Sequence, residues 1–234
     1  MTKKVKWAIL FIVLALLAAG GIYLAPKAAS VWRMPRIAKP FVDSSTQSTF
    51  KETKTTLVYD KNGEELCQIK SSKELYYVTF DQIPKTLANA FVVMEDRDFY
   101  SHSGIDYKAI VRAALANQKS SEIVQGASTI TQQLARNIFL TQEVTWERKI
   151  EEMFIAWDLE KKYSKEEILE FYLNNIYFGN GYYGVEAAAR GYFSKSVSEL
   201  TLSEQAFIAA IPNNPSKYNP LTNFENTLRR RDLI

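Results

Sequence analysis

The stretch WERKIEEMFIAWDLEKKYSKEEILEFYLN, residues 146–174, decides the fold class. Its apolar side chains recur three, four and seven positions apart, which is the spacing of one face of an α-helix. Ser164 followed by Glu167 forms a capping-box pattern, which marks a helix start. The stretch therefore predicts one helix from about Trp146 to Lys162 and a second helix directly after it.

Two neighbouring glutamates in the first of these helices fall on different faces. An apolar stripe and a charged, solvent-facing stripe can be traced: Ile150, Met153, Phe154 and Trp157, and then Glu147, Glu151, Asp158 and Lys162. Glu152 belongs to neither, because it aligns with Arg148 on a side that is otherwise apolar. A carboxylate placed there is costly unless it is paired or used, so Glu152 is a candidate site residue. The alternative is a purely structural ion pair between Arg148 and Glu152.

Most of the remaining signals also favour helices. Pro84 can open a helix that ends near Met94, Asp106 can cap a helix that runs through Asn117, and Thr201 begins a second capping box. We therefore predict a mainly α-helical domain.

One short β-hairpin is expected before these helices. Residues 57–59 and 65–69 flank Asn62-Gly63, a dipeptide that tolerates positive φ at both turn positions. The hairpin marks the beginning of the folded part, near Thr56.

The N-terminal region predicts a membrane anchor. Residues 7–24 form an uncharged stretch of 18 residues, close to the length that spans a bilayer, and lysines precede it. We predict a cytoplasmic tail over 1–6, a transmembrane helix over 7–24, a proline-containing linker over 25–55 and a catalytic domain over 56–234. The alternative is a signal peptide cleaved near residues 18–21.

Composition excludes several kinds of site. The formal charge of +3 comes from 29 basic and 26 acidic residues, too balanced for a dedicated nucleic-acid binder. Cys67 and His102 are the only cysteine and histidine, so an intrachain disulfide is impossible and a cysteine or histidine metal cluster is not expected.

Two polar runs stand out as candidate sites. EDRDFYSHSG, residues 95–104, closes an apolar helix with a dense charge cluster, and GASTITQQLARN, residues 126–137, offers hydroxyls and amides to an oxygen-rich ligand. Taken singly, each has a plain alternative: a solvated helix end for the first and an ordinary capped helix start for the second.

Together these runs resemble the first two motifs of glycosyltransferase family 51, the peptidoglycan polymerases of class A penicillin-binding proteins and their monofunctional relatives. Residues 148–152 fit RKxxE, residues 165–174 fit KxxILExYLN, and Arg230-Arg231 begins the fifth motif. The resemblance covers residues 56–234 and implies a lysozyme-like helical fold. Because the chain stops at Ile234, we expect truncation within the fifth motif.

The resemblance implies a reaction in which the 4-hydroxyl of lipid II attacks the anomeric carbon of a growing glycan held on a lipid diphosphate, with inversion. Glu95 is then the general base, which Asp96 could not simply replace, and Glu152 the second essential carboxylate, steering cations or a divalent metal. The residues implied for the diphosphate are Ser128, Gln132, Gln133, Arg136, Arg148 and Lys149. A lysine is frequent in the family where Arg136 stands, so its contacts are expected to differ in detail.

Further expectations follow from the resemblance. His102 shapes the loop after the base, and Tyr172 is architectural. No cofactor and no protein-held metal site are expected, although Mg²⁺ or Mn²⁺ can accompany the diphosphate. The partners implied are lipid II, the growing glycan, membrane lipids, cell-wall synthesis proteins and moenomycin-type inhibitors, but not nucleic acid. The place implied is the bacterial cytoplasmic membrane, with the domain outside; the alternatives are a muramidase or lytic transglycosylase and a non-catalytic membrane scaffold.

Overall fold

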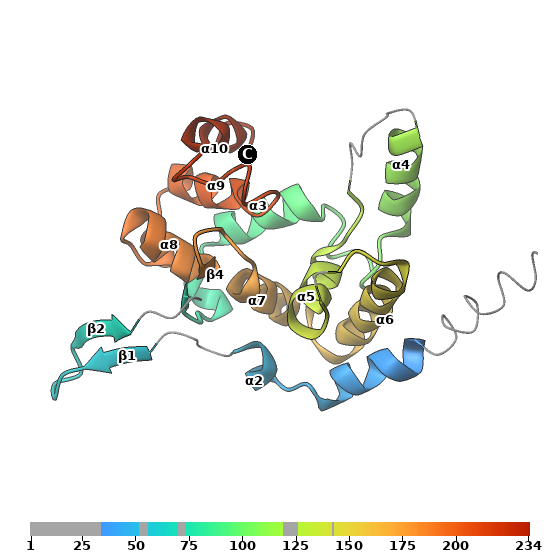
Figure 1. Cartoon of the computed structure of the whole chain (residues 1–234), viewed down its shortest axis with the longest axis horizontal. Helices are drawn as coiled ribbons and strands as arrows, with labels where there is room; N and C mark the ends of the chain where they lie inside the picture. The colour runs from blue at the N-terminus through green and yellow to red at the C-terminus, as the bar shows by residue number, and fades with distance from the viewer. Residues whose placement is uncertain (1–33, 52–55, 70–73, 119–125, 142) are drawn as a thin grey trace, which may run out of the picture.

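The structure of the protein is a computed structural model that describes residues 34–51, 56–69, 74–118, 126–141 and 143–234. The described elements confirm a mainly helical fold (Figure 1). A helix over 34–44 is followed by α2 (Gln47–Phe50), β1 (Thr56–Tyr59), β2 (Glu65–Ile69), β3 (Glu74–Leu75), η1 (Phe80–Gln82), α3 (Lys85–Glu95), α4 (Tyr107–Gln118), α5 (Ile130–Phe139), α6 (Trp146–Lys162), α7 (Lys165–Asn175), β4 (Tyr182–Tyr183), α8 (Val185–Phe193), η2 (Val197–Glu199), α9 (Leu202–Ala210) and α10 (Phe224–Arg231).

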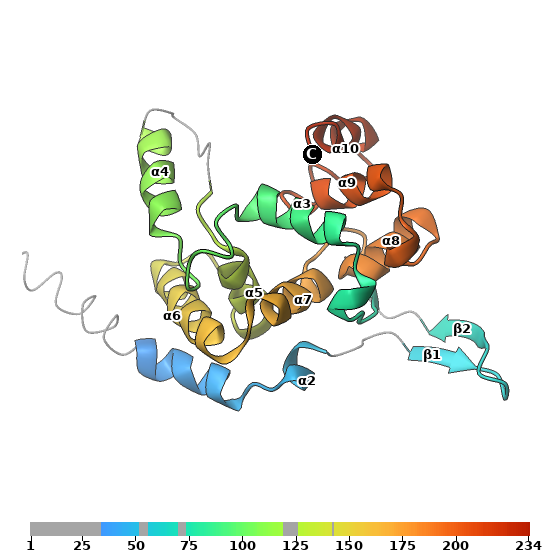
Figure 2. The same cartoon turned by 180° about the vertical axis from the view of Figure 1, so that it is seen from behind.

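The core is organised around α7, which packs against α5 and α6, while α9 packs against α3 and α10 (Figures 1 and 2). The apolar side chains of α7 are almost completely buried, including Ile168, Leu169 and Leu173. Burial of large apolar side chains is the main force that holds such helices together. The predicted caps are confirmed: Ser164 accepts from the N–H of Glu167, and Thr201 accepts from the N–H of Glu204.

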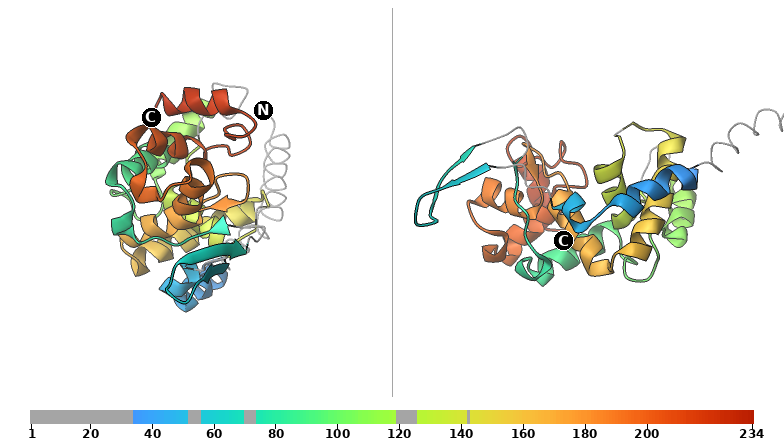
Figure 3. Two further views of the ribbon diagram at one scale, coloured as in Figure 1. Left: turned by 90° about the vertical axis from the view of Figure 1, so that its left-hand side faces the viewer. Right: turned by 90° about the horizontal axis from the view of Figure 1, so that it is seen from below.

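The β-hairpin is confirmed, but its turn differs from the prediction. β1 and β2 pair antiparallel, with a bulge between Val58 and Tyr59, and project from the helical body (Figure 3). Gly63 has a φ of +86°, whereas Asn62 is not among the residues with positive φ. A longer loop forms because the Asp60 carboxylate accepts the N–H groups of Asn62 and Glu64 at 2.7 and 2.9 Å.

The predicted linker over 25–55 is wrong for its described part. Residues 34–51 are largely helical and pack onto α6 and α7, where the Phe50 ring stacks on Phe171 with centroids 4.2 Å apart. Lys162 Nζ donates to the carbonyl oxygens of Val42 and Ser45 at 2.7 and 2.5 Å, close to the end of the 34–44 helix. These contacts fix the segment, which the proline-containing composition did not predict.

The apolar stripe of α6 is not its most buried side. Trp157 of that stripe is 48% exposed, whereas Ile155, Leu159 and Glu152 are completely buried. The face that contains Glu152 is therefore the one packed into the domain, where α6 packs against α5 and α7.

No helix in the described ranges is both long and apolar enough to cross a membrane. The predicted spanning segment over 7–24 lies outside the described residues.

Candidate active site

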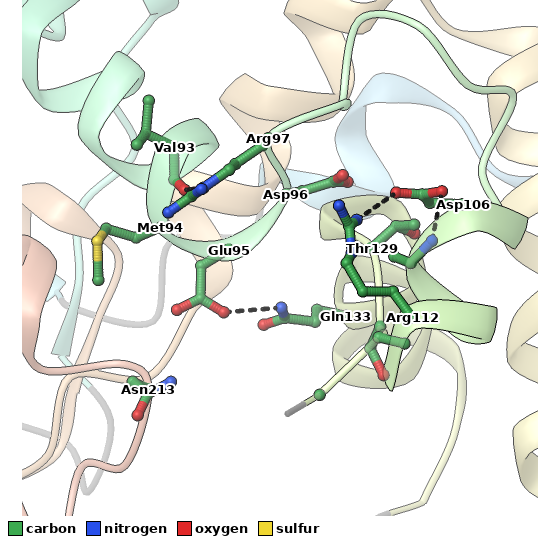
Figure 4. Close-up of a pocket in the computed structure, with 14 residues that line it drawn as sticks. Val93, Met94, Glu95, Asp96, Arg97, Asp106, Arg112, Thr129, Gln133 and Asn213 are labelled. Atoms are coloured by element: carbon green, nitrogen blue, oxygen red, sulfur yellow. Dashed lines mark hydrogen bonds and ion pairs between the residues drawn. The ribbon is translucent and has the colours of Figure 1, made fainter. Parts of the chain in front are cut away.

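A cavity of about 450 Å³ opens at the C-terminal end of α3 (Figure 4). Its wall is formed by residues 93–97, by Asp106, Ala109 and Arg112 at the start of α4, by residues 126–129 with Gln133 of α5, and by Asn213. Both polar runs that the sequence singled out therefore meet at one cavity.

Glu95 is the last residue of α3 and is partly exposed to this cavity. Gln133 Nε2 donates a hydrogen bond to Glu95 Oε2 at 3.1 Å (Figure 4). Within the described residues, this is the one hydrogen bond of the Glu95 carboxylate, and Oε1 has no partner. An ionised carboxylate with one bound and one accessible oxygen can still accept a proton.

Asp96 has a different role because its side chain is buried. Its carboxylate accepts from His102 Nε2 at 2.9 Å and from the backbone N–H of Ile130 at 3.0 Å. The N–H of Gly104 donates to His102 Nδ1, so the ring proton lies on Nε2. Asp96 thereby ties the loop after Glu95 to the start of α5, and its carboxylate is occupied by these hydrogen bonds.

Gly104 allows this loop to approach α6. Its φ is +88°, and an added Cβ would lie 2.7 Å from the carbonyl oxygen of Ala156. Glycine alone fits both restrictions, which explains the glycine that closes the first polar run.

A cluster of cations lies beside the cavity, around the buried carboxylate of Glu152. Arg148 and Lys149 both form ion pairs with Glu152, the latter with Nζ 2.7 Å from Oε2. Lys149 Nζ also donates to Ser128 Oγ at 2.7 Å, and Ser128 lines the cavity. Ser128 therefore joins the cation cluster to the cavity that holds Glu95.

The cations repel one another at close range. Burial and the positive charges of Arg136 and Arg148 lower the pKa of Lys149 to about 8, from 10.5. Burial and the charge of Arg136 also lower the pKa of Arg148. Nε of Arg136 is buried and has no hydrogen-bond partner among the described residues. A cluster with this excess of positive charge favours an anionic ligand.

The two adjacent glutamines predicted to contact substrate are placed differently. Gln132 is 1% exposed, and its Oε1 accepts the backbone N–H of Thr129 at 3.0 Å in a capping box. It therefore builds the start of α5 and is not among the residues that line the cavity. Gln133 does line the cavity, where its amide binds Glu95.

Arg112 and Asn213 line the cavity but lie outside the two polar runs, and neither was predicted from the sequence as a site residue. Arg112 is exposed and its Nη2 lies 3.8 Å from Asp106 Oδ2. Arg112 lies in the second turn of α4, and the sequence had identified Asp106 as the cap of that helix. The positive charge of Arg112 could therefore have been considered as part of the site. Asn213 follows α9 and carries no recognisable pattern.

In the part of the chain that the structure describes, no three His, Cys, Asp or Glu side chains are grouped so that they could hold a metal ion. Glu152 is already paired with two cations. A divalent cation at this place would have to be held chiefly by its ligand.

Known proteins give a consistent comparison. A family profile described as Transglycosylase matches residues 62–234. The chain is 46% identical over 232 residues to penicillin-binding protein 1A of Aquifex aeolicus (strain VF5), covering 99% of this chain and 30% of that protein. It is 41% identical over 235 residues to penicillin-binding protein 4 of Bacillus subtilis (strain 168), covering 100% of this chain and 37% of that protein.

Among solved structures, penicillin-binding protein 1A from Haemophilus influenzae matches with a TM-score of 0.42 and 26% identity, over 77% of this chain and 17% of that one. The chain spans about a third of the length of the two curated relatives named above.

Proposed function

Because the chain belongs to the transglycosylase family, we propose that it is a peptidoglycan glycosyltransferase that polymerises lipid II into glycan strands. The observation that carries this proposal is the pairing of an accessible carboxylate with a cation cluster at one cavity: Glu95 on one side, and Lys149 reached through Ser128 on the other. A transfer from a lipid diphosphate needs both, because a proton must be removed and an anion must leave.

The proposed step begins with proton removal. The 4-hydroxyl of lipid II is a poor nucleophile at neutral pH, and Glu95 takes its proton on Oε1 as the oxygen attacks the anomeric carbon of the donor. The new glycosidic bond forms while the bond from that carbon to the diphosphate oxygen breaks. The electron pair leaves with the diphosphate, and the configuration inverts.

Arg136, Arg148 and Lys149 are proposed to stabilise the leaving diphosphate. Charge-assisted hydrogen bonds from preorganised cations are strongest where negative charge develops. Glu152 is proposed to hold two of these cations in place, which its complete burial and its two ion pairs support. A divalent cation, where one is used, would add positive charge at the leaving diphosphate, and no step depends on it.

The place of action is proposed to be the bacterial cytoplasmic membrane. We propose that residues 7–24 cross it once and that the lysozyme-like helical domain lies outside, because that stretch is uncharged and preceded by lysines. Both substrates carry polyprenyl tails, so an anchored enzyme meets them at the bilayer. Moenomycin-type inhibitors are proposed to compete for this cavity and its cations, and other cell-wall synthesis proteins to act beside it.

Incubation of the purified protein with lipid II tests the proposal. Glycan polymer is expected. Soluble fragments cut from preformed glycan would instead indicate a muramidase or lytic transglycosylase, and no product from either substrate would indicate a scaffold. A muramidase or lytic transglycosylase cuts a glycosidic bond and releases no diphosphate, so it would not need the cation cluster.

A further inference from the structure

Two hydrogen bonds connect the protein core to Glu95. The Tyr172 hydroxyl donates to Gln133 Oε1 at 3.3 Å, and Gln133 Nε2 donates to Glu95 Oε2 at 3.1 Å. The three residues come from α7, α5 and α3, so the connection exists only in the folded domain. Tyr172 is completely buried, and its ring packs edge-on against Phe91 with centroids 6.2 Å apart.

The order of donors along this connection fixes the orientation of the amide. A glutamine side chain has one accepting end and one donating end. If the Gln133 amide were reversed, its carbonyl oxygen would face the Glu95 carboxylate and the Tyr172 hydroxyl proton would lose its acceptor. A buried donor without a partner is costly, so the tyrosine holds the amide in one orientation.

We propose that Tyr172 is a positioning residue which, by orienting Gln133, assigns different tasks to the two oxygens of Glu95. Oε2 is held by the amide, and Oε1 remains free to take the proton of the attacking hydroxyl. This inference rests on the proposed function and adds to it a residue that the sequence indicated as architectural only.

The tyrosine matters most after the proton has moved. Once Glu95 is neutral, its attraction for the amide N–H weakens, because hydrogen bonds to ionised groups are the stronger ones. The Tyr172 hydroxyl then keeps the amide in place until Glu95 loses its proton again. Burial and the nearby charge of Glu95 raise the pKa of Tyr172 well above its ordinary value, so the hydroxyl stays a donor throughout.

Four variants test the proposal with lipid II as substrate: Tyr172→Phe, Gln133→Ala, the double variant and Tyr163→Phe. Tyr172→Phe is expected to lower kcat about tenfold at unchanged KM, since one buried hydrogen bond is lost. The loss for Gln133→Ala is expected to be on the order of thirtyfold, and the double variant should match it within about twofold. Tyr163→Phe is the matched control, because it loses a hydroxyl bonded to Ser45, neither residue lines the cavity, and the variant should keep full kcat.

Three outcomes would overturn the inference. The first is full kcat for Tyr172→Phe. The second is a further tenfold loss when Tyr172→Phe is added to Gln133→Ala, because the tyrosine would then act by packing and not through Gln133. If Tyr172→Phe does not fold, as judged by thermal unfolding, Gln133→Met replaces it, and full kcat for that variant is the contrary result. An inactive Glu95→Gln beside a fully active Tyr172→Phe would refute this inference alone, whereas lack of polymer from the unsubstituted protein would refute the proposed function as well.

Discussion

Two carboxylates of the site occupy opposite environments. Glu95 ends α3 at the cavity and is held through one oxygen by a neutral amide, while Glu152 is completely buried in α6 and paired with two cations. A base needs an accessible oxygen, and a carboxylate that is occupied by cations cannot easily accept a proton. Two glutamates of one site can therefore differ in function because their surroundings differ. Glu95 is suited to take a proton, and Glu152 is suited to hold cations in position.

The largest expected effect tests the accessible carboxylate. Glu95→Gln keeps the size of the side chain but removes the proposed base, so polymerisation of lipid II should fall on the order of a hundredfold or more. Thermal unfolding should change little, because the Glu95 side chain is partly exposed. Full activity of this variant would contradict the proposal that Glu95 is the carboxylate that takes the proton.

The buried carboxylate should show a mixed effect. Glu152→Gln leaves Arg148 and Lys149 without their counter-ion, and breaking a buried ion pair costs about 3 to 5 kcal/mol of folding free energy. Chemical denaturation should show this loss, and polymerisation should fall on the order of tenfold because the cations lose their position. A variant with unchanged stability would contradict the paired arrangement.

A smaller effect should appear as pH dependence of substrate binding. The Lys149 pKa of about 8 means that this cation is charged below that pH and loses its charge above it. KM for lipid II should therefore rise several-fold as the pH increases from 7 to 9, since the diphosphate loses one partner. Lys149→Arg should flatten this rise, because arginine stays charged.

The smallest effect is expected one position away from Glu152. Glu151 is partly exposed, and the structure gives it no ion pair among the described residues. Glu151→Gln should change polymerisation by less than about twofold. Equal losses for Glu151→Gln and Glu152→Gln would contradict the assignment of these residues to different faces of α6.

Local patterns predicted much of this fold. The helix starts at Ser164 and Thr201 follow from capping boxes, and Glu152 could be distinguished from Glu151 because helical spacing assigns each a face. The position of residues 34–51 could not be predicted, since Phe50 is held by Phe171, more than a hundred residues along the chain. Contacts of that kind leave no local pattern.

The site could be predicted only in part, because some of its contacts also join residues that are far apart in the sequence. Motifs indicated Glu95 and the cations, but they could not show which of two adjacent glutamines points at Glu95. That choice depends on how α5 packs against α6 and α7, which buries Gln132 in its cap and leaves Gln133 at the cavity. Asn213 is brought to the cavity by the loop after α9 and could be found only in three dimensions.

The most direct test of the different roles of Glu95 and Glu152 is the binding of a lipid-linked diphosphate sugar, measured by titration of the Glu95→Gln and Glu152→Gln variants. Glu95→Gln should bind this donor analogue with a Kd within about threefold of the unsubstituted protein, while Glu152→Gln should bind it on the order of tenfold more weakly. Equal Kd values for the two variants would contradict the account.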